Sequence, residues 1–165
     1  MTIVRHEMGP RFSEMTVAKM GTCNLIVLSG QVAENVSLGI EGQTREVLRF
    51  IDRLLAHVGA NKTHIISARI YLASVGDYSA MNAVWDEWVP RGHTPARSTM
   101  GAKLVNPDYK IEIEVTAVVE TDAPGHDHHA HEHEHEHGHA HAHGHAHELD
   151  ENCEAPDSDT SNAKK

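Results

Sequence analysis

Residues 110–120, KIEIEVTAVVE, restrict the fold of this chain most, because apolar and polar side chains alternate along them. Successive side chains of a β-strand point to opposite faces of a sheet. One face would carry Ile111, Ile113, Val115 and Ala117, and the other would carry Glu112, Glu114 and Thr116. The pattern predicts a strand with one buried face. Its second face must meet water, a ligand or a partner subunit.

Two amphipathic segments are expected to cover the buried face of this sheet as helices. Apolar residues recur with a period near 3.6 across residues 42–58, and Gly59 follows as a C-terminal stop. A second helix is expected from an N-cap at Asp77 to about Val89, and Pro90 ends it. The expected buried stripe of this second helix comprises Tyr78, Met81, Val84, Trp85 and Trp88.

Strand-like runs accompany the helices at residues 15–19, 24–32, 64–74, 96–104 and 110–120. The element order is therefore ββαβαββ, which we interpret as two hairpins interleaved with two helices. Right-handed crossovers then give an α+β fold, an open sheet with both helices on one face. The uncovered face is too apolar to remain fully wet, so oligomerisation through that face is expected.

Arg97 and Glu112 place charged side chains in otherwise core-forming, strand-like sequence. An arginine offers a rigid fork of N–H donors that suits a carboxylate, and a glutamate can accept or return protons. The pair suggests a binding site for a small acid with a proton-handling group. The residues alone leave a simpler alternative for Glu112, which is a glutamate on a solvated sheet face.

Two further features accompany these charges. Gly30, in the run Ser29-Gly30-Gln31, lies inside a strand pattern, where a glycine indicates a bend of the sheet or a close approach of the backbone to a ligand. Asn82 lies at a partly inward position of the second helix. It is either solvated or hydrogen-bonded within the structure or the site.

Charge is divided unevenly along the chain. Residues 1–121 contain 12 Lys and Arg against 13 Asp and Glu, whereas residues 122–165 contain 2 against 11. The near-neutral first part lacks the basic surface that nucleic-acid binding needs, so no nucleic-acid partner is expected. No window approaches the roughly 18 apolar residues of a membrane span, so no membrane partner is expected. Cys23 and Cys153 do not make a disulfide framework, which favours a reducing, cytoplasmic setting.

Four segments resemble the Rid family, which is also called YjgF or the reactive intermediate deaminase family. They are SGQV at 29–32, MNAVW at 81–85, PARS at 95–98 and KIEIEVTAV at 110–118, and the resemblance extends over about residues 9–119. It implies a chorismate-mutase-like α+β subunit that assembles as a homotrimer, with sites in the clefts between subunits. It also implies hydrolysis of enamines and imines, such as 2-aminoacrylate or 2-iminopropanoate, to 2-keto acids and ammonia without a cofactor.

The resemblance also implies roles for individual residues. Arg97 matches the family arginine that grips the substrate carboxylate, and Glu112 matches the acid that positions or activates water. Ser29, Gly30 and Asn82 match other positions of the cleft.

Two positions of the expected substrate site depart from the family pattern. Phe12 stands where active members commonly place a tyrosine after a Gly-Pro pair, and Thr99 stands where the family often has a cysteine. Both changes keep carboxylate binding but bear on substrate preference, rate and redox regulation, because a threonine hydroxyl is not oxidised as a thiol is. A small-acid binding protein without turnover is therefore an alternative to the enzyme.

After Pro124-Gly125 the composition changes to a histidine-rich segment without apolar periodicity. We expect residues 1–121 to form a Rid-like domain and residues 122–165 to form a disordered, acidic tail. The clustered histidines are His126, His128, His129, His131, His133, His135, His137, His139, His141, His143, His145 and His147. Closely spaced imidazoles bind Ni²⁺, Zn²⁺, Cu²⁺ or Co²⁺, so metal buffering or delivery is another candidate function. A solvated spacer and an artificial purification tag are the simpler interpretations.

Overall fold

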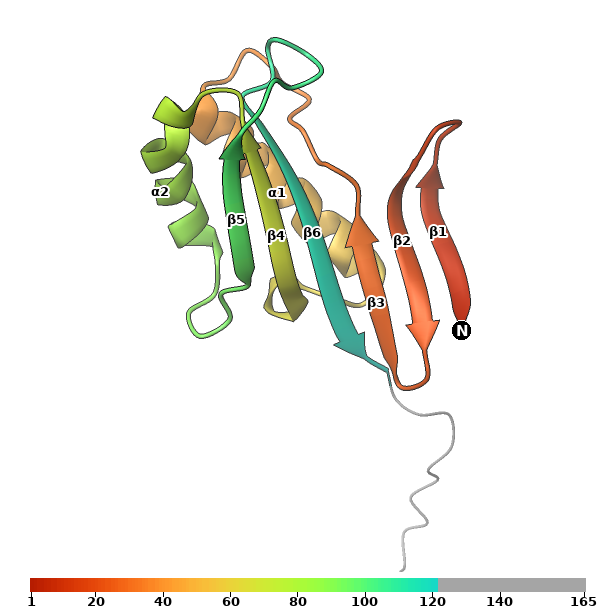
Figure 1. The fold of residues 1–165 in the computed structure, drawn as a ribbon. Coiled ribbons are helices and arrows are strands. Elements are labelled where there is room, and N and C mark those ends of the chain that lie inside the picture. Colours follow the sequence, from red (N-terminus) through yellow and green to blue (C-terminus); the bar gives the residue numbers. More distant parts are fainter. Residues whose placement is uncertain (122–165) are drawn as a thin grey trace, which may run out of the picture. The chain divides into compact units, whose positions relative to one another are not determined.

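The computed structural model describes residues 1–121, which form one sheet and two α-helices (Figure 1). The elements are β1 Thr2–Met8, β2 Ser13–Met20, β3 Cys23–Leu28, α1 Ile40–His57, β4 Ile65–Leu72, α2 Tyr78–Trp88, β5 Ala96–Gly101 and β6 Ile111–Glu120. Short 3₁₀ helices, η1 Lys62–His64 and η2 Val75–Asp77, precede β4 and α2. Within these residues, neither α-helix is long and apolar enough to cross a membrane.

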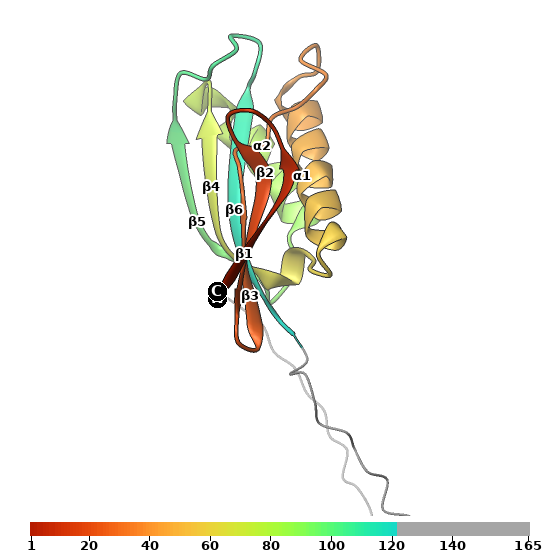
Figure 2. The same cartoon turned by 90° about the vertical axis from the view of Figure 1, so that its right-hand side faces the viewer.

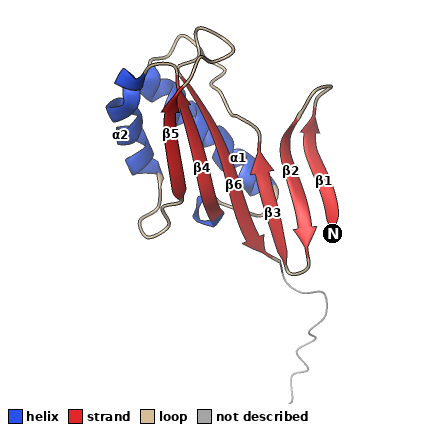
Figure 3. Cartoon of the chain, viewed as in Figure 1, coloured by secondary structure: helices blue, strands red, loops and turns tan. Residues whose placement is uncertain are grey.

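The strands form one sheet in the order β1-β2-β3-β6-β4-β5. Neighbouring strands are antiparallel, except that β4 and β5 run parallel. Both helices lie on the same face of the sheet, as the side view in Figure 2 shows, and Figure 3 separates the two layers by colour. The expected α+β class, with both helices on one face, is confirmed.

The hydrophobic core lies between the helices and the sheet. The inward residues of β6 are Ile111, Ile113, Val115 and Ala117, none of which is more than 2% exposed. α1 contributes Val47, Leu48, Ile51, Leu54 and Leu55 to the same core. Burying a large aliphatic side chain contributes about 1.5–3 kcal/mol relative to exposure. This layer therefore determines which residues of β6 are left on the uncovered face.

The first strand, β1, was not expected from the sequence. It pairs with β2 at the edge of the sheet, and most of its side chains are exposed. A strand with few buried side chains does not need the apolar alternation by which strands are recognised in a sequence. Periodicity therefore gives no signal for β1.

The expectation of a second hairpin is wrong. β6 lies between β3 and β4, so β5 and β6 are not neighbours. The connection from β5 to β6 is instead held by the buried side chain of Gln43 on α1. Gln43 Nε2 donates to Asp108 O at 3.0 Å, and Gln43 Oε1 accepts from Lys110 N at 2.9 Å. One buried amide thus satisfies two backbone groups of this connection.

Candidate active site

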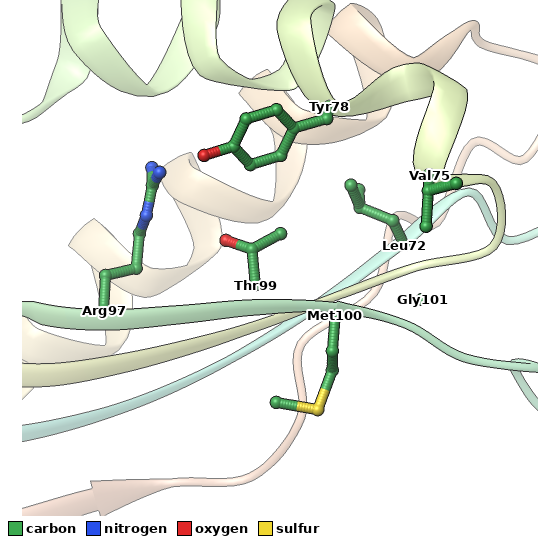
Figure 4. A pocket seen from close by; sticks show the side chains of 7 residues that line it. All are labelled: Leu72, Val75, Tyr78, Arg97, Thr99, Met100 and Gly101. Carbon is green, nitrogen blue, oxygen red and sulfur yellow. The ribbon is translucent and has the colours of Figure 1, made fainter.

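A pocket lies between β5 and the beginning of α2 (Figure 4). Its volume is about 440 Å³, and it is lined by Leu72, Val75, Tyr78, Arg97, Thr99, Met100 and Gly101. Arg97 and Thr99 point from β5 towards the helix layer, whereas the side chain of Met100 points away from it. Alternate residues of one strand therefore place a charge and a hydroxyl in the same pocket.

The guanidinium of Arg97 is held by two side chains of α2. Arg97 Nη2 donates to Asn82 Oδ1 at 2.9 Å, and Arg97 Cζ lies 5.0 Å from the ring centroid of Trp85. Asn82 and Trp85 are three residues apart on the helix and therefore share a face. Trp85 is only 4% exposed, so its ring is itself fixed by the core. Of the two alternatives left open for Asn82, the structure shows the hydrogen bond, and other N–H groups of the arginine fork remain for a ligand.

Thr99 adds an unpaired hydroxyl to this pocket. Its Oγ1 is buried and has no hydrogen-bond partner within residues 1–121. A buried hydroxyl without a partner costs free energy that a ligand atom would recover. The pocket therefore offers a cationic fork and a hydroxyl next to each other on β5, a combination suited to a carboxylate.

Helix periodicity placed Tyr78 and Trp85 together in the buried stripe of α2. Trp85 is buried, but Tyr78 is 46% exposed, so the expectation for Tyr78 is wrong. Tyr78 is the first residue of α2, and its ring lies near Thr99 in the pocket, with the hydroxyl directed towards Arg97 (Figure 4). Sequence reasoning did not recognise either residue as part of the site, because aromatic residues at helical spacing are typical of a core.

Glu112 lies on β6 among residues of the uncovered face, between the buried Ile111 and Ile113. It packs against Gly30, where a Cβ atom would lie 2.7 Å from Glu112 Cδ. Gly30 therefore leaves the space that the carboxylate group occupies. The neighbour of Gly30 is thus a side chain of the same chain, whereas the sequence suggested a bend of the sheet or a ligand.

Burial raises the pKa of the Glu112 carboxyl above its ordinary value, and the nearby charge of Glu114 raises the pKa further. Glu114 is itself engaged on the same face, where it accepts from Tyr71 Oη at 3.4 Å and lies 3.6 Å from Arg69 Nη1. General acid–base catalysis favours a carboxyl pKa above the ordinary value, so the direction of this change is the one that proton transfer needs. This property suits the proton-handling role proposed for Glu112.

Gly30 contacts Glu112 and follows Ser29, whereas Phe12 borders a cavity that reaches α1. This second cavity, of about 290 Å³, is lined by Phe12, Gly30 and Glu14 and, on α1, by Phe50, Arg53 and Leu54; Phe12 is 61% exposed. Ser29 Oγ donates to Glu14 Oε2 at 3.0 Å, so the hydroxyl is already paired. Glu14, in β2, was not recognised in the sequence, since a single glutamate next to the apolar run gives no signal for such a contact.

Gln31 connects this group to β6. Its Nε2 donates to Glu14 Oε2 and Ser29 Oγ, both at 3.0 Å, and its backbone pairs with Ile113 in an isolated bridge. The predicted site residues thus form two groups. One consists of Asn82, Arg97 and Thr99, and the other consists of Ser29, Gly30 and Glu112, while Phe12 lines the neighbouring cavity with Gly30.

Arg97 and Glu112 lie on different faces of the sheet. Arg97 is in register with Ala68 of β4, and Ala68 is in register with Val115 of β6, on the face beneath the helices. Glu112 is in register with Tyr71, and Tyr71 with Met100, on the uncovered face. Residues in register share a face. One chain therefore does not bring Arg97 and Glu112 together.

Residues 1–121 contain no group of three or more His, Cys, Asp or Glu side chains placed to hold a metal ion. The histidines expected to bind metal, His126 to His147, lie outside the described residues. The expected metal site and the expected boundary after Thr121 therefore stay predictions.

The chain is similar to known proteins over the region that forms the sheet and helices. The profile of the family described as endoribonuclease L-PSP matches residues 8–119. A RutC family protein of Haemophilus influenzae is 42% identical over 118 residues, which cover 71% of this chain and 98% of that protein. The chloroplastic Reactive Intermediate Deaminase A of Arabidopsis thaliana is 31% identical over 102 residues, covering 58% of this chain and 54% of that protein.

A solved structure gives the same result for the fold. The crystal structure of a YjgF family member from Neisseria meningitidis is 46% identical in sequence. It superposes with a TM-score of 0.67 and covers 74% of this chain and 98% of that one.

Proposed function

The chain belongs to the Rid family, whose members are also called YjgF or RutC proteins, and on this basis we propose that it hydrolyses reactive 2-imino and 2-enamino acids. The products are 2-keto acids and ammonia. The observation that carries the proposal is the anchored guanidinium of Arg97 in a pocket with the unpaired hydroxyl of Thr99. The name of the Arabidopsis relative, a reactive intermediate deaminase, supports the same chemistry.

In the proposed reaction, Arg97 and Thr99 bind the substrate carboxylate and Glu112 handles the water. Water adds to the carbon of the protonated C=N bond while Glu112 takes one proton from it, which gives a neutral carbinolamine. Glu112 returns this proton to the nitrogen and the C–N bond breaks. As the C=O bond of the keto acid forms, Glu112 takes up the hydroxyl proton and passes it to the departing ammonia, which leaves as ammonium. Every proton comes from water or substrate, so the reaction needs no cofactor. Holding the substrate in place contributes to the rate by fixing the reacting carbon relative to the water.

We propose that the two catalytic residues of one site come from two copies of the chain, assembled as a homotrimer. Arg97 and Glu112 lie on opposite faces of the sheet, so a neighbouring copy must supply one of them. The uncovered face also exposes apolar side chains, with Val27 and Met100 exposed by 44% and 43% in a single chain. Covering these side chains favours association through this face.

The proposal is tested by measuring hydrolysis of 2-aminoacrylate or 2-iminopropanoate generated in the assay. Arg97→Ala should abolish the accelerated reaction, and Arg97→Lys should restore little of it, because lysine keeps the charge but lacks the planar fork. Arg91→Ala, an exposed arginine before β5, serves as the matched control. An unchanged rate in Arg97→Ala would contradict the assignment. If the wild-type chain binds 2-keto acids but does not accelerate hydrolysis, the non-catalytic binding protein is favoured.

RNA cleavage, which the family description names, is not proposed for this chain. Residues 1–121 carry 12 basic and 13 acidic side chains, a balance without the positive surface that contacts phosphates. Cys23, a free thiol in the described region, is compatible with the proposed cytoplasmic setting.

We propose a second function, metal binding, for the histidine-rich segment. The supporting observation is the density of twelve histidines between His126 and His147. Imidazole binds Ni²⁺, Zn²⁺, Cu²⁺ and Co²⁺ only when neutral, so binding should weaken as the pH falls through about 6. Calorimetric titration of Ni²⁺ into the full chain and into a chain ending at Thr121 tests this proposal. Equal stoichiometry in the two proteins would exclude the segment as the site.

A further inference from the structure

The helix side chains around Arg97 come from one face of α2. Tyr78, Asn82 and Trp85 follow one another at steps of four and three residues, a spacing that brings side chains of a helix to the same face. Asn82 and Trp85 contact the guanidinium but do not line the pocket, so they support Arg97 from outside it. Tyr78 does line the pocket, together with Arg97 and Thr99. Of the three helix residues, Tyr78 is therefore the one placed to meet a ligand.

The three tyrosines of the chain lie in different environments. Tyr71 donates to a glutamate on the uncovered face of the sheet, and Tyr109 lines a separate cavity. Tyr78 is 46% exposed, and its hydroxyl is directed towards Arg97 (Figure 4). A phenol hydroxyl that faces a guanidinium across a pocket can donate to a ligand that lies between them.

A carboxylate in this position has more acceptor sites than one arginine fills. Its two oxygens offer about four lone-pair positions, and a bidentate guanidinium uses two of them. The hydroxyls of Tyr78 and Thr99 can donate to the positions that remain. Hydrogen bonds to an ionised group are about twice as strong as those between neutral groups. A further donor therefore contributes most when the ligand carries a negative charge.

We infer that Tyr78 is a further substrate-binding residue, whose hydroxyl donates a hydrogen bond to the carboxylate bound by Arg97. This inference rests on the proposed function and adds a residue that selects for the charged group of the substrate. Both donors belong to the same chain. The contact is therefore present whichever residues a second copy adds to the site.

Tyr78→Phe tests this role, because it keeps the ring and removes only the hydroxyl. We expect KM for 2-iminopropanoate generated in the assay to rise about tenfold, with kcat changing less than about threefold, because the bond forms in the ground state and the transition state alike. Tyr109→Phe makes the same change in the separate cavity and should leave both constants unchanged. An unchanged KM in Tyr78→Phe, or a loss confined to kcat, would overturn the inference and leave the deaminase proposal intact.

If the chain does not hydrolyse the imine, the deaminase proposal fails, and binding decides the inference separately. Calorimetry with pyruvate then measures the carboxylate contact without turnover. A Kd for pyruvate about tenfold higher in Tyr78→Phe than in the wild-type chain supports the inference. An unchanged Kd, or no binding of pyruvate by the wild-type chain, overturns it.

Pyruvamide distinguishes a bond to the carboxylate from a loss of packing, because it replaces the charged group by a neutral amide of similar size. Its Kd should rise only about threefold or less in Tyr78→Phe, since the lost hydrogen bond involves a neutral acceptor. An equal loss of affinity for pyruvate and pyruvamide would show that Tyr78 acts through packing and would overturn the inference. If the wild-type chain binds pyruvate but not pyruvamide, the two Kd values for pyruvate decide.

Discussion

Arg97 and Glu112 point to opposite faces of one sheet, and β4 lies between their strands. Both side chains are fixed by neighbours. Asn82 and Trp85 of α2 contact the guanidinium of Arg97, and Gly30 leaves the space that the Glu112 carboxylate occupies. Each face of the sheet therefore carries a prepared half of the proposed site. The following predictions test how the halves are used.

Two inactive variants should restore activity to each other when they are mixed. Arg97→Ala keeps Glu112, and Glu112→Gln keeps Arg97, so a site between a copy of each contains both catalytic residues. In randomly mixed symmetric trimers, about a quarter of the sites would be of this kind. We expect about that fraction of wild-type activity after the variants are unfolded and refolded together. Activity that stays at background, with mixed assemblies shown by mass spectrometry, would contradict a site shared between copies.

Trp85 should act on the substrate through Arg97. Trp85→Leu removes the ring beneath the guanidinium, a contact that contributes about 0.5–2 kcal/mol, whereas Trp85→Phe keeps a weaker one. We expect KM to rise about threefold to thirtyfold in Trp85→Leu, less in Trp85→Phe, with kcat changing little. Trp88→Phe is the control for the loss of an indole ring. The Trp88 ring adjoins that of Trp85, but the cation over it is Lys62. An equal fall of kcat in both Trp85 variants with unchanged KM would contradict this role.

Gly30→Ala should disturb the catalytic step more than substrate binding. Its methyl group would displace the Glu112 carboxylate, and a shift of about 1 Å in a reacting group can lower kcat about a hundredfold. Affinity for a 2-keto acid should change little, because Arg97 lies on the other face. Gly39→Ala is the matched control, because a Cβ atom at that glycine would meet nothing within 4 Å. A Gly30→Ala protein with normal kcat would show that the position of Glu112 is unimportant.

Activity should fall at low pH as Glu112 becomes protonated, and Glu114 should set where this happens. The charge of Glu114 raises the pKa of Glu112, so Glu114→Gln should lower that pKa and extend activity to lower pH. The pH profile of kcat/KM measures this shift. Glu120→Gln, at the exposed end of β6, should leave the profile where it is. A shift to higher pH in Glu114→Gln would contradict the electrostatic explanation.

The sequence predicts those parts of the fold that depend on local periodicity. The alternation on β6 and the apolar stripe of α1 gave the correct buried faces, because burial of one face imposes its own period. The insertion of β6 between β3 and β4 could not be predicted, since strand pairing is non-local. Gln43 shows why, as its contacts with Asp108 and Lys110 join residues more than sixty positions apart.

The same limit applies to the candidate site. The motif around Arg97 suggested a carboxylate clamp, which stays a prediction, and the partly inward position of Asn82 left a hydrogen bond open as one of two alternatives, which the structure shows. The separation of Arg97 from Glu112 depends on register across three strands, which periodicity does not contain. Trp85 was assigned to the core for the same reason, since its second contact, with Arg97, comes from another strand.

The central place of β6 in the sheet has a consequence for how the protein is made. During synthesis, β1 to β3 and β4 to β5 emerge as two separate groups of strands, and only β6 joins them. The sheet therefore cannot close until residues 111–120 have left the ribosome. Until then both groups expose unpaired strand edges, which favour aggregation. Newly made chains should consequently depend on chaperones for nearly the whole time of their synthesis, despite the small size of the domain.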